Sequence, residues 1–161
     1  MKKNVVLLGV LGSVLMFGSV VCYAAETAKW DKNDYKDTQV ASGYYDAKSI
    51  KTEGEIVSWT EKYIMTEEGI TFFNDKLSKH DVCKKSMESN GKVTQFQLDY
   101  QIKKKMYRGV AKRYYNKANK LVCTDKDTGN DFKSEWTKII PRSPMMTAKY
   151  DLVSKYKVKF H

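Results

Sequence analysis

Hydrophobic and polar residues alternate along several segments of the chain, as they do in β-strands that bury one face. The alternation is clearest over 92–102, where apolar side chains stand at every second position from Phe96 to Ile102. It recurs over 55–65, although Glu61 interrupts the apolar face there, so we expect this residue near an edge of the sheet. Further strands are predicted over 43–46, 106–115, 120–124 and 132–140.

Two segments change to the spacing of an amphipathic helix. The first follows Thr66, a residue type that caps helices, and opens with two acids that suit the positive end of a helix. The second follows Ser143, has Pro144 in its first turn, and runs to Tyr156. An antiparallel sheet with helices on one face accounts for all of these segments. We therefore predict a single α+β domain with about five or six strands, a C-terminal helix and a second helix packed on the sheet.

Residues 1–24 differ in composition from the rest of the chain. Lys2 and Lys3 precede a long uncharged apolar run, and the small residue Ala24 stands before a polar continuation. This is the layout of a secretory signal peptide that is cleaved after Ala24, which leaves one mature domain over 25–161.

Two alternatives to cleavage stay open. The apolar run is close to the length of a membrane anchor, although glycines and serines dilute it. Lipid attachment at Cys22 is the other alternative, although Val21 stands where a lipid-attachment motif needs a small residue. In each case the sequence predicts an exported protein, located in the periplasm, on the cell surface or in the medium.

The chain is strongly basic, with 29 Lys and Arg residues against 19 Asp and Glu and a net charge of +10. Nearly all of the cations are lysines. Lysine is a hydrated point charge suited to diffuse attraction, whereas arginine is the planar fork favoured for reading phosphates and base edges. The composition therefore favours acidic glycans, acidic lipids or host proteins as partners over sequence-specific nucleic acid. Solubility through self-repulsion is the alternative explanation.

A cluster of cations follows the best-marked strand and is interleaved with tyrosines, a mixture that contacts polyanions by charge and stacking. Strand alternation from Met106 predicts that Arg108 and Lys112 share one face and that Arg113 points to the other. Lysines that protect an edge strand are the alternative explanation for the cluster. The candidate binding residues are Lys103, Lys104, Lys105, Arg108, Lys112 and Arg113.

Two cysteines lie in the mature chain, Cys83 and Cys123, and the export signal makes them candidates for a disulfide. Two separate thiols are the alternative. We predict no metal site, because the chain has two histidines, His80 and the terminal His161, without metal-ligand spacing. No cofactor is expected either.

The chain carries no recognisable catalytic motif, neither a nucleophile elbow, a phosphate loop nor a zinc-protease helix. Asp81 follows His80, but neighbours on a helix do not face each other, so a surface histidine is the favoured interpretation. The acids Glu67 and Glu68 suit a helix start better than a glycosidase pair. We therefore predict a protein that is not an enzyme, and keep a small basic hydrolase with His80 as base as the weakest alternative.

The order of several short motifs resembles the surface-adhesin protein E family. The first half matches in an aromatic-aspartate turn over 43–51 and a tryptophan strand over 55–59. The second half matches in Tyr107-Arg108, in Tyr114-Tyr115 and in the approach to the last helix over 136–143. The two cysteines of the mature chain stand at other positions than those of the family.

The resemblance implies a small antiparallel sheet with a helix packed on it, a dimer as one possible assembly, and no catalytic residues. Characterised members are bacterial adhesins that bind host extracellular-matrix and plasma proteins. We therefore expect an exported surface protein that binds such proteins or acidic glycans. The alternative is a periplasmic envelope module that binds a small ligand or a partner protein in a pocket beside the sheet.

Overall fold

The computed structural model describes residues 30–33, 38–129, 132 and 134–160, and the predicted signal peptide lies outside the described residues. Two short 3-10 turns, η2 (Ala47–Ser49) and η3 (Lys126–Thr128), connect strands. The strands and helices are β1 (Trp30–Asn33), β2 (Ala41–Asp46), β3 (Lys51–Glu53), β4 (Ile56–Met65), α1 (Glu67–Leu77), α2 (Asp81–Asn90), β5 (Val93–Lys103), β6 (Met106–Asn116), β7 (Leu121–Thr124), β8 (Thr137–Lys138) and α3 (Pro144–Ser154).

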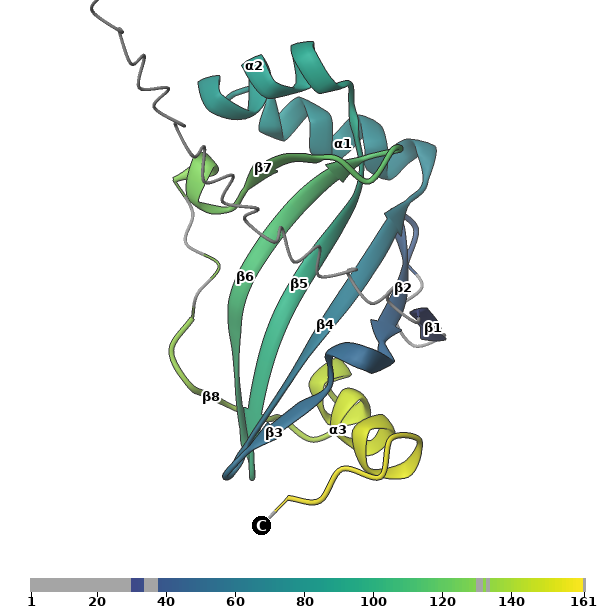
Figure 1. Ribbon diagram of the computed structural model, residues 1–161, viewed down its shortest axis with the longest axis vertical. Helices are drawn as coiled ribbons and strands as arrows, with labels where there is room; N and C mark the ends of the chain where they lie inside the picture. Colours follow the sequence, from purple (N-terminus) through teal and green to yellow (C-terminus); the bar gives the residue numbers. More distant parts are fainter. Residues whose placement is uncertain (1–29, 34–37, 130–131, 133, 161) are drawn as a thin grey trace, which may run out of the picture.

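The strands form one open antiparallel sheet in the order β1-β2-β4-β5-β6-β7 (Figure 1). The short strand β3 pairs with the start of β4, whereas β2 pairs with its end. In the same way β8 pairs with the start of β6 and β7 with its end. The long strands β4, β5 and β6 are therefore the frame of the sheet. The predicted single α+β domain with an antiparallel sheet is confirmed.

One face of the sheet, the helix-covered face, is buried at both ends. Alternate side chains of β4 and β5 point to it, as the sequence pattern predicts. At one end they pack under α1 and α2, around Phe96 and Leu77, and at the other end under α3, around Trp59 and Leu152. Tyr100 packs against both clusters, so the two ends belong to one core. Figure 1 shows α1 and α2 at one end of the long strands and α3 at the other.

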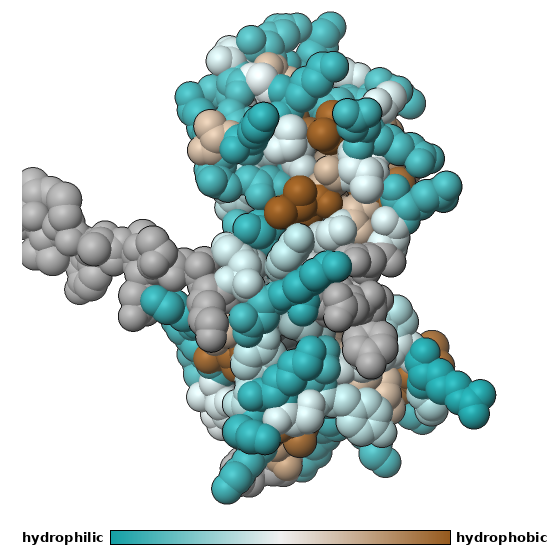
Figure 2. All heavy atoms as spheres, turned by 90° about the vertical axis from the view of Figure 1, so that its right-hand side faces the viewer, coloured by the Kyte–Doolittle hydropathy of each residue, from teal (hydrophilic) through white to brown (hydrophobic). Residues whose placement is uncertain are grey.

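The other face of the sheet, the open face, carries polar side chains. Asp99 accepts a hydrogen bond from the Thr60 hydroxyl at 2.8 Å and two from Arg113, both at 2.6 Å. Figure 2 views the molecule from one side, and the hydrophobic side chains exposed there form only small separate patches on a hydrophilic surface. No helix within the described ranges is long and apolar enough to cross a membrane.

The starts of α1 and α3 are the predicted ones. The Thr66 hydroxyl accepts a hydrogen bond from the amide of Gly69 at 3.2 Å, and the Ser143 hydroxyl accepts one from Met146 at 3.3 Å. Gly69 also has a packing role, because a β-carbon at this position would collide with the carbonyl oxygen of Val40 beside it. Glycine therefore allows α1 to approach the start of β2.

The disulfide between Cys83 and Cys123 is formed, with the two α-carbons 5.4 Å apart, as the sequence predicted. It joins α2 to β7. The sequence did not predict α2, because Cys83 is the only buried residue of that helix and no apolar stripe marks it.

Two predictions about strands are wrong. Glu61 lies in β4, inside the sheet, and is 1 % exposed. Its carboxylate accepts hydrogen bonds from Trp59 Nε1 at 3.0 Å and from the Tyr63 hydroxyl at 2.7 Å, which is why it tolerates burial. The strand predicted over 132–140 is reduced to β8. The chain before β8 bonds to Gly109 instead, whose amide donates to the Ser134 hydroxyl at 2.9 Å.

Candidate functional site

A β-bulge in β6 decides which face each basic side chain takes. The register between β5 and β6 shifts between Asp99 and Tyr100, which leaves Val110 as an extra residue in β6. The prediction that Arg108 and Lys112 share a face is therefore wrong, because the extra residue inverts the alternation that follows it. Arg108 bonds to a side chain of the open face, whereas Lys112 packs among rings of the helix-covered face.

Four of the six predicted basic residues gather where β5 turns into β6. The ammonium of Lys103 lies 4.5 Å from the centroid of the Trp136 ring, and the guanidinium of Arg108 lies 4.7 Å from it. Arg108 also donates two hydrogen bonds to the amide oxygen of Gln101, at 2.8 and 2.6 Å. Two cations are therefore held close together by one indole ring.

Lys104 and Lys105 make the turn between the two strands. Lys104 has a left-handed backbone (φ 43°), its ammonium lies 3.0 Å from Glu55, and its carbonyl oxygen accepts a hydrogen bond from Lys149. The carbonyl oxygen of Lys105 accepts a hydrogen bond from the amide of Ile139, which brings β8 alongside. We call this end of the sheet the basic hairpin: Lys103, Lys104, Lys105, Arg108, Trp136 and Lys138.

The other two predicted binding residues lie elsewhere. Arg113 is held on the open face by its two hydrogen bonds to Asp99, so its charge is already paired. Lys112 lies on the opposite face of the same strand. The structure therefore does not bring all six basic residues into one patch.

An apolar groove borders the basic hairpin. It lies between β8 and α3, and its cavity has a volume of about 590 Å³. Tyr150 and Val153 are exposed along it. The lining, which we call the α3 groove, is Lys105, Lys138, Ile139, Pro141, Met146, Lys149, Tyr150 and Val153.

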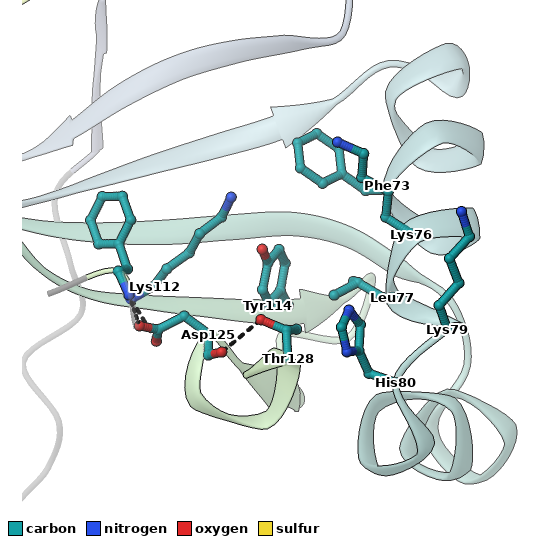
Figure 3. A pocket seen from close by; sticks show the side chains of 10 residues that line it. Phe73, Lys76, Leu77, Lys79, His80, Lys112, Tyr114, Asp125 and Thr128 are labelled. Atoms are coloured by element: carbon teal, nitrogen blue, oxygen red, sulfur yellow. Dashed lines mark hydrogen bonds between the residues drawn. The ribbon is translucent and has the colours of Figure 1, made fainter. Parts of the chain in front are cut away.

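A second hollow lies at the other end of the helix-covered face, between α1, β6 and η3 (Figure 3). Its volume is about 540 Å³, within the range of small-molecule sites. The lining, which we call the Lys112 pocket, is Phe73, Lys76, Leu77, Lys79, His80, Lys112, Tyr114, Asp125, Thr128 and Phe132.

The ammonium of Lys112 lies among aromatic rings. Its distance to the ring centroid is 4.6 Å for Phe96, 5.0 Å for Tyr114 and 5.1 Å for Phe73. Burial is the main reason that the pKa of Lys112 is lowered to about 8; Asp125 opposes the shift, and the nearby charge of Lys76 contributes a smaller part of it. Within the described part of the chain, no hydrogen bond or ion pair reaches this ammonium. Three ring faces are thus its nearest partners.

Asp125 supports the wall of the pocket and does not pair with that ammonium. One of its carboxylate oxygens accepts a hydrogen bond from the backbone amide of Lys112 at 3.1 Å, and the other accepts one from the amide of Phe132 at 2.6 Å. Asp125 is 5 % exposed. Its charge therefore fixes the chain that follows β7 against β6.

His80 lies at the junction of α1 and α2, immediately before α2 begins, and its side chain faces the Lys112 pocket (Figure 3). The sequence placed it on a helix, whereas it stands at the N-cap of α2; its side chain is partly exposed. Among the described residues, no hydrogen bond or ion pair joins its ring to a carboxylate. Nor do His, Cys, Asp and Glu side chains of the described ranges gather in a group of three that could hold a metal ion.

Sequence reasoning selected Lys112 only as part of a surface patch and missed the ring-lined pocket around it. One signal was present: Gly109, inside a predicted strand, is a residue type that marks a bulge or a close approach of the chain. A β-carbon at Gly109 would lie 2.7 Å from the Phe132 ring, so this glycine lets Phe132 cross β6 and form one wall of the pocket.

We compared the chain with family models, curated proteins and solved structures, and nothing matches it. The resemblance to the surface-adhesin protein E family accordingly stays a prediction from the residue motifs.

Proposed function

We propose that this protein is an exported binding domain, without catalytic activity, that attaches to acidic glycans of the host extracellular matrix through the basic hairpin. The observation that carries the proposal is the gathering of Lys103, Lys105, Arg108 and Lys138 at one end of the sheet. The signal peptide and the family resemblance in the sequence support export and attachment.

Two features of the basic hairpin suit a glycan with repeated negative charges. The lysines at the turn are exposed and can follow an irregular row of sulfates or carboxylates as separate point charges. The indole ring of Trp136 contacts both Lys103 and Arg108, which keeps these two cations close together. Binding of this kind is expected to weaken steeply with salt.

The test measures binding of the mature protein to immobilised heparin as the salt concentration rises. In one variant Lys103, Lys104 and Lys105 are all replaced by Gln. We expect this variant to bind roughly tenfold more weakly at physiological salt, with a shallower salt dependence, because three positive charges are removed from the basic hairpin.

The matched control replaces three exposed lysines at the far end of the molecule, Lys84, Lys85 and Lys117, by Gln. It loses the same charge and is expected to bind nearly as well as the wild type. Equal losses in the two variants would show that net charge alone attracts heparin, and no loss in either would remove the basic hairpin from the mechanism. Binding to matrix proteins and not to heparin would redirect the proposal to a protein partner.

The Lys112 pocket favours a second candidate function. A hollow of about 540 Å³ beside the sheet supports an envelope module that binds a small ligand. Protease treatment of intact cells separates the two candidates, because an adhesin must be accessible from outside and a periplasmic module must not.

A further inference from the structure

We propose that the Lys112 pocket binds a small aromatic carboxylate, with the ammonium of Lys112 as the counter-ion of the carboxylate and the surrounding rings in contact with its apolar body. This inference deepens the second candidate function. It shares no residue with the basic hairpin, so the two proposals can fail independently.

The first argument is that Lys112 is a partly buried charge whose partner is missing from the described chain. A buried charge ordinarily has an opposite charge or several hydrogen bonds. Asp125 is the acid of the pocket, but its two oxygens accept hydrogen bonds from backbone amides of Lys112 and Phe132, and among the described residues it forms no ion pair with the Lys112 ammonium. Contacts with aromatic rings make up for only part of the hydration that the Lys112 ammonium loses on burial, which agrees with its lowered pKa.

The second argument is the balance of charge around the hollow. Lys76 and Lys79 line it together with Lys112, against the single acid Asp125. Lys76 is close enough to disfavour the charged form of Lys112, although by less than Asp125 favours it. An anion bound beside Lys112 would relieve this repulsion, and the two outer lysines would attract it toward the pocket.

The third argument is the apolar part of the lining. The rings of Phe73 and Tyr114 lie 6.5 Å apart, and Phe132 lines another part of the pocket. Burial and, to a smaller extent, the charge of Asp125 raise the pKa of Tyr114 to about 12. The Tyr114 hydroxyl therefore stays neutral and can donate a hydrogen bond to a carboxylate. Figure 3 shows the Lys112 side chain extending toward the rings of Phe73 and Tyr114. Flat walls of this kind select a flat ligand.

Titration calorimetry with 1-naphthoate tests the proposal, and the uncharged 1-naphthalenemethanol serves as the matched ligand. Lys112→Met removes the charge and keeps an unbranched apolar side chain. We expect it to weaken naphthoate binding at least tenfold, because a charged hydrogen bond is lost. Binding of the alcohol is expected to change by less than about threefold, since it never used the charge.

The control variant is Lys105→Met, which removes a lysine from the lining of the α3 groove. It should bind naphthoate as the wild type does. Equal losses in the Lys105 and Lys112 variants, equal losses for the two ligands, or no naphthoate binding by the wild type would each overturn the proposal.

A labelling experiment on the wild-type protein gives an answer even where the Lys112 variant fails to fold. The probe is pyridoxal phosphate at pH 8: the lysine nitrogen adds to the aldehyde carbon, water leaves, and borohydride delivers hydride to the resulting imine to give a stable amine. Peptide mapping then locates the label. Naphthoate is expected to reduce labelling of Lys112 at least fivefold and to leave Lys105 unchanged, and equal labelling of Lys112 with and without naphthoate would refute the proposal.

Discussion

The two ends of the helix-covered face place their lysine side chains differently. Under α1 and α2, a lysine is placed inside, among rings of Phe73, Phe96 and Tyr114. Under α3, the buried residues are apolar except Asp151, which has the ammonium of Lys155 3.6 Å away, and the lysines of this end lie at the surface around the α3 groove and the end of α3. A disulfide ties the first end together, whereas within the described residues no covalent link holds α3.

This difference separates lysines that cost the fold little from a lysine that costs stability but can bind a ligand. A lysine at the edge of an apolar groove keeps its ammonium hydrated, so it lowers the stability of the fold very little. Charge within a ring-lined pocket is partly dehydrated, which weakens the fold but makes the ammonium available to a ligand. The disulfide lies at the end that carries this cost. We infer that covalent closure there offsets the burial of Lys112.

The largest effect is expected from a variant without the disulfide, which tests the comparison of the two ends directly. Replacing Cys83 and Cys123 by Ala opens a link with a sequence separation of 40 residues. We expect the free energy of unfolding to fall by roughly 3–4 kcal/mol, because the unfolded chain gains entropy. Urea denaturation of the two proteins measures the change.

Hydrogen exchange localises this effect. Amides of α2 should exchange faster in the double variant beyond the change set by global unfolding, and amides of α3 should not. If the α3 amides lost as much additional protection as those of α2, the disulfide would stabilise the whole sheet evenly, and the contrast between the two ends would disappear.

The elements that the sequence predicted well are those whose signal is local. Strands β4, β5 and β6 show long alternation, and the starts of α1 and α3 carry capping residues. The elements that it missed depend on contacts with distant parts of the same chain. α2 buries only Cys83, so its position is set by the disulfide. β8 is short because the chain before it forms the Ser134–Gly109 hydrogen bond instead of a longer strand pairing with β6.

The candidate sites follow the same division. The basic hairpin could be predicted because its lysines are consecutive in the sequence. The Lys112 pocket could not, because its walls come from α1, β6 and the segment after β7, and because the extra residue Val110 reverses the expected side of Lys112. A single inserted residue in a strand leaves no mark in composition, yet it moves a charge from one face to the other.

The next prediction tests the other end of the sheet. Leu152 in α3 is fully buried, and Leu152→Ala should lower the free energy of unfolding by about 3 kcal/mol, through lost burial and the cavity that remains. Val153→Ala on the same helix is the control: Val153 is 44 % exposed, so we expect a loss below about 0.5 kcal/mol. Urea denaturation measures both. Similar losses for the two variants would mean that α3 is held by helix propensity and not by its buried face.

The smallest expected effect concerns the charge of Lys112. Its pKa in the folded protein is lowered to about 8 from an ordinary value of 10.5, mainly by burial. Between these two values the unfolded chain binds more protons than the folded one, so stability rises with pH. From pH 7.5 to 9.5 we expect a gain of about 1–2 kcal/mol from this group. Urea denaturation at both pH values measures it.

Lys112→Met isolates this contribution. Burial also lowers the pKa of Lys62, against the charge of Asp46, but this lysine is present in both proteins and cancels in the difference. The upper limit of pH 9.5 excludes most tyrosine ionisation. Burial and the neighbouring Glu61 raise the pKa of Tyr63, so folding would lose stability above pH 10. A gain of the same size in the variant would show that Lys112 is hydrated in the folded protein, and the two ends would then treat charge alike.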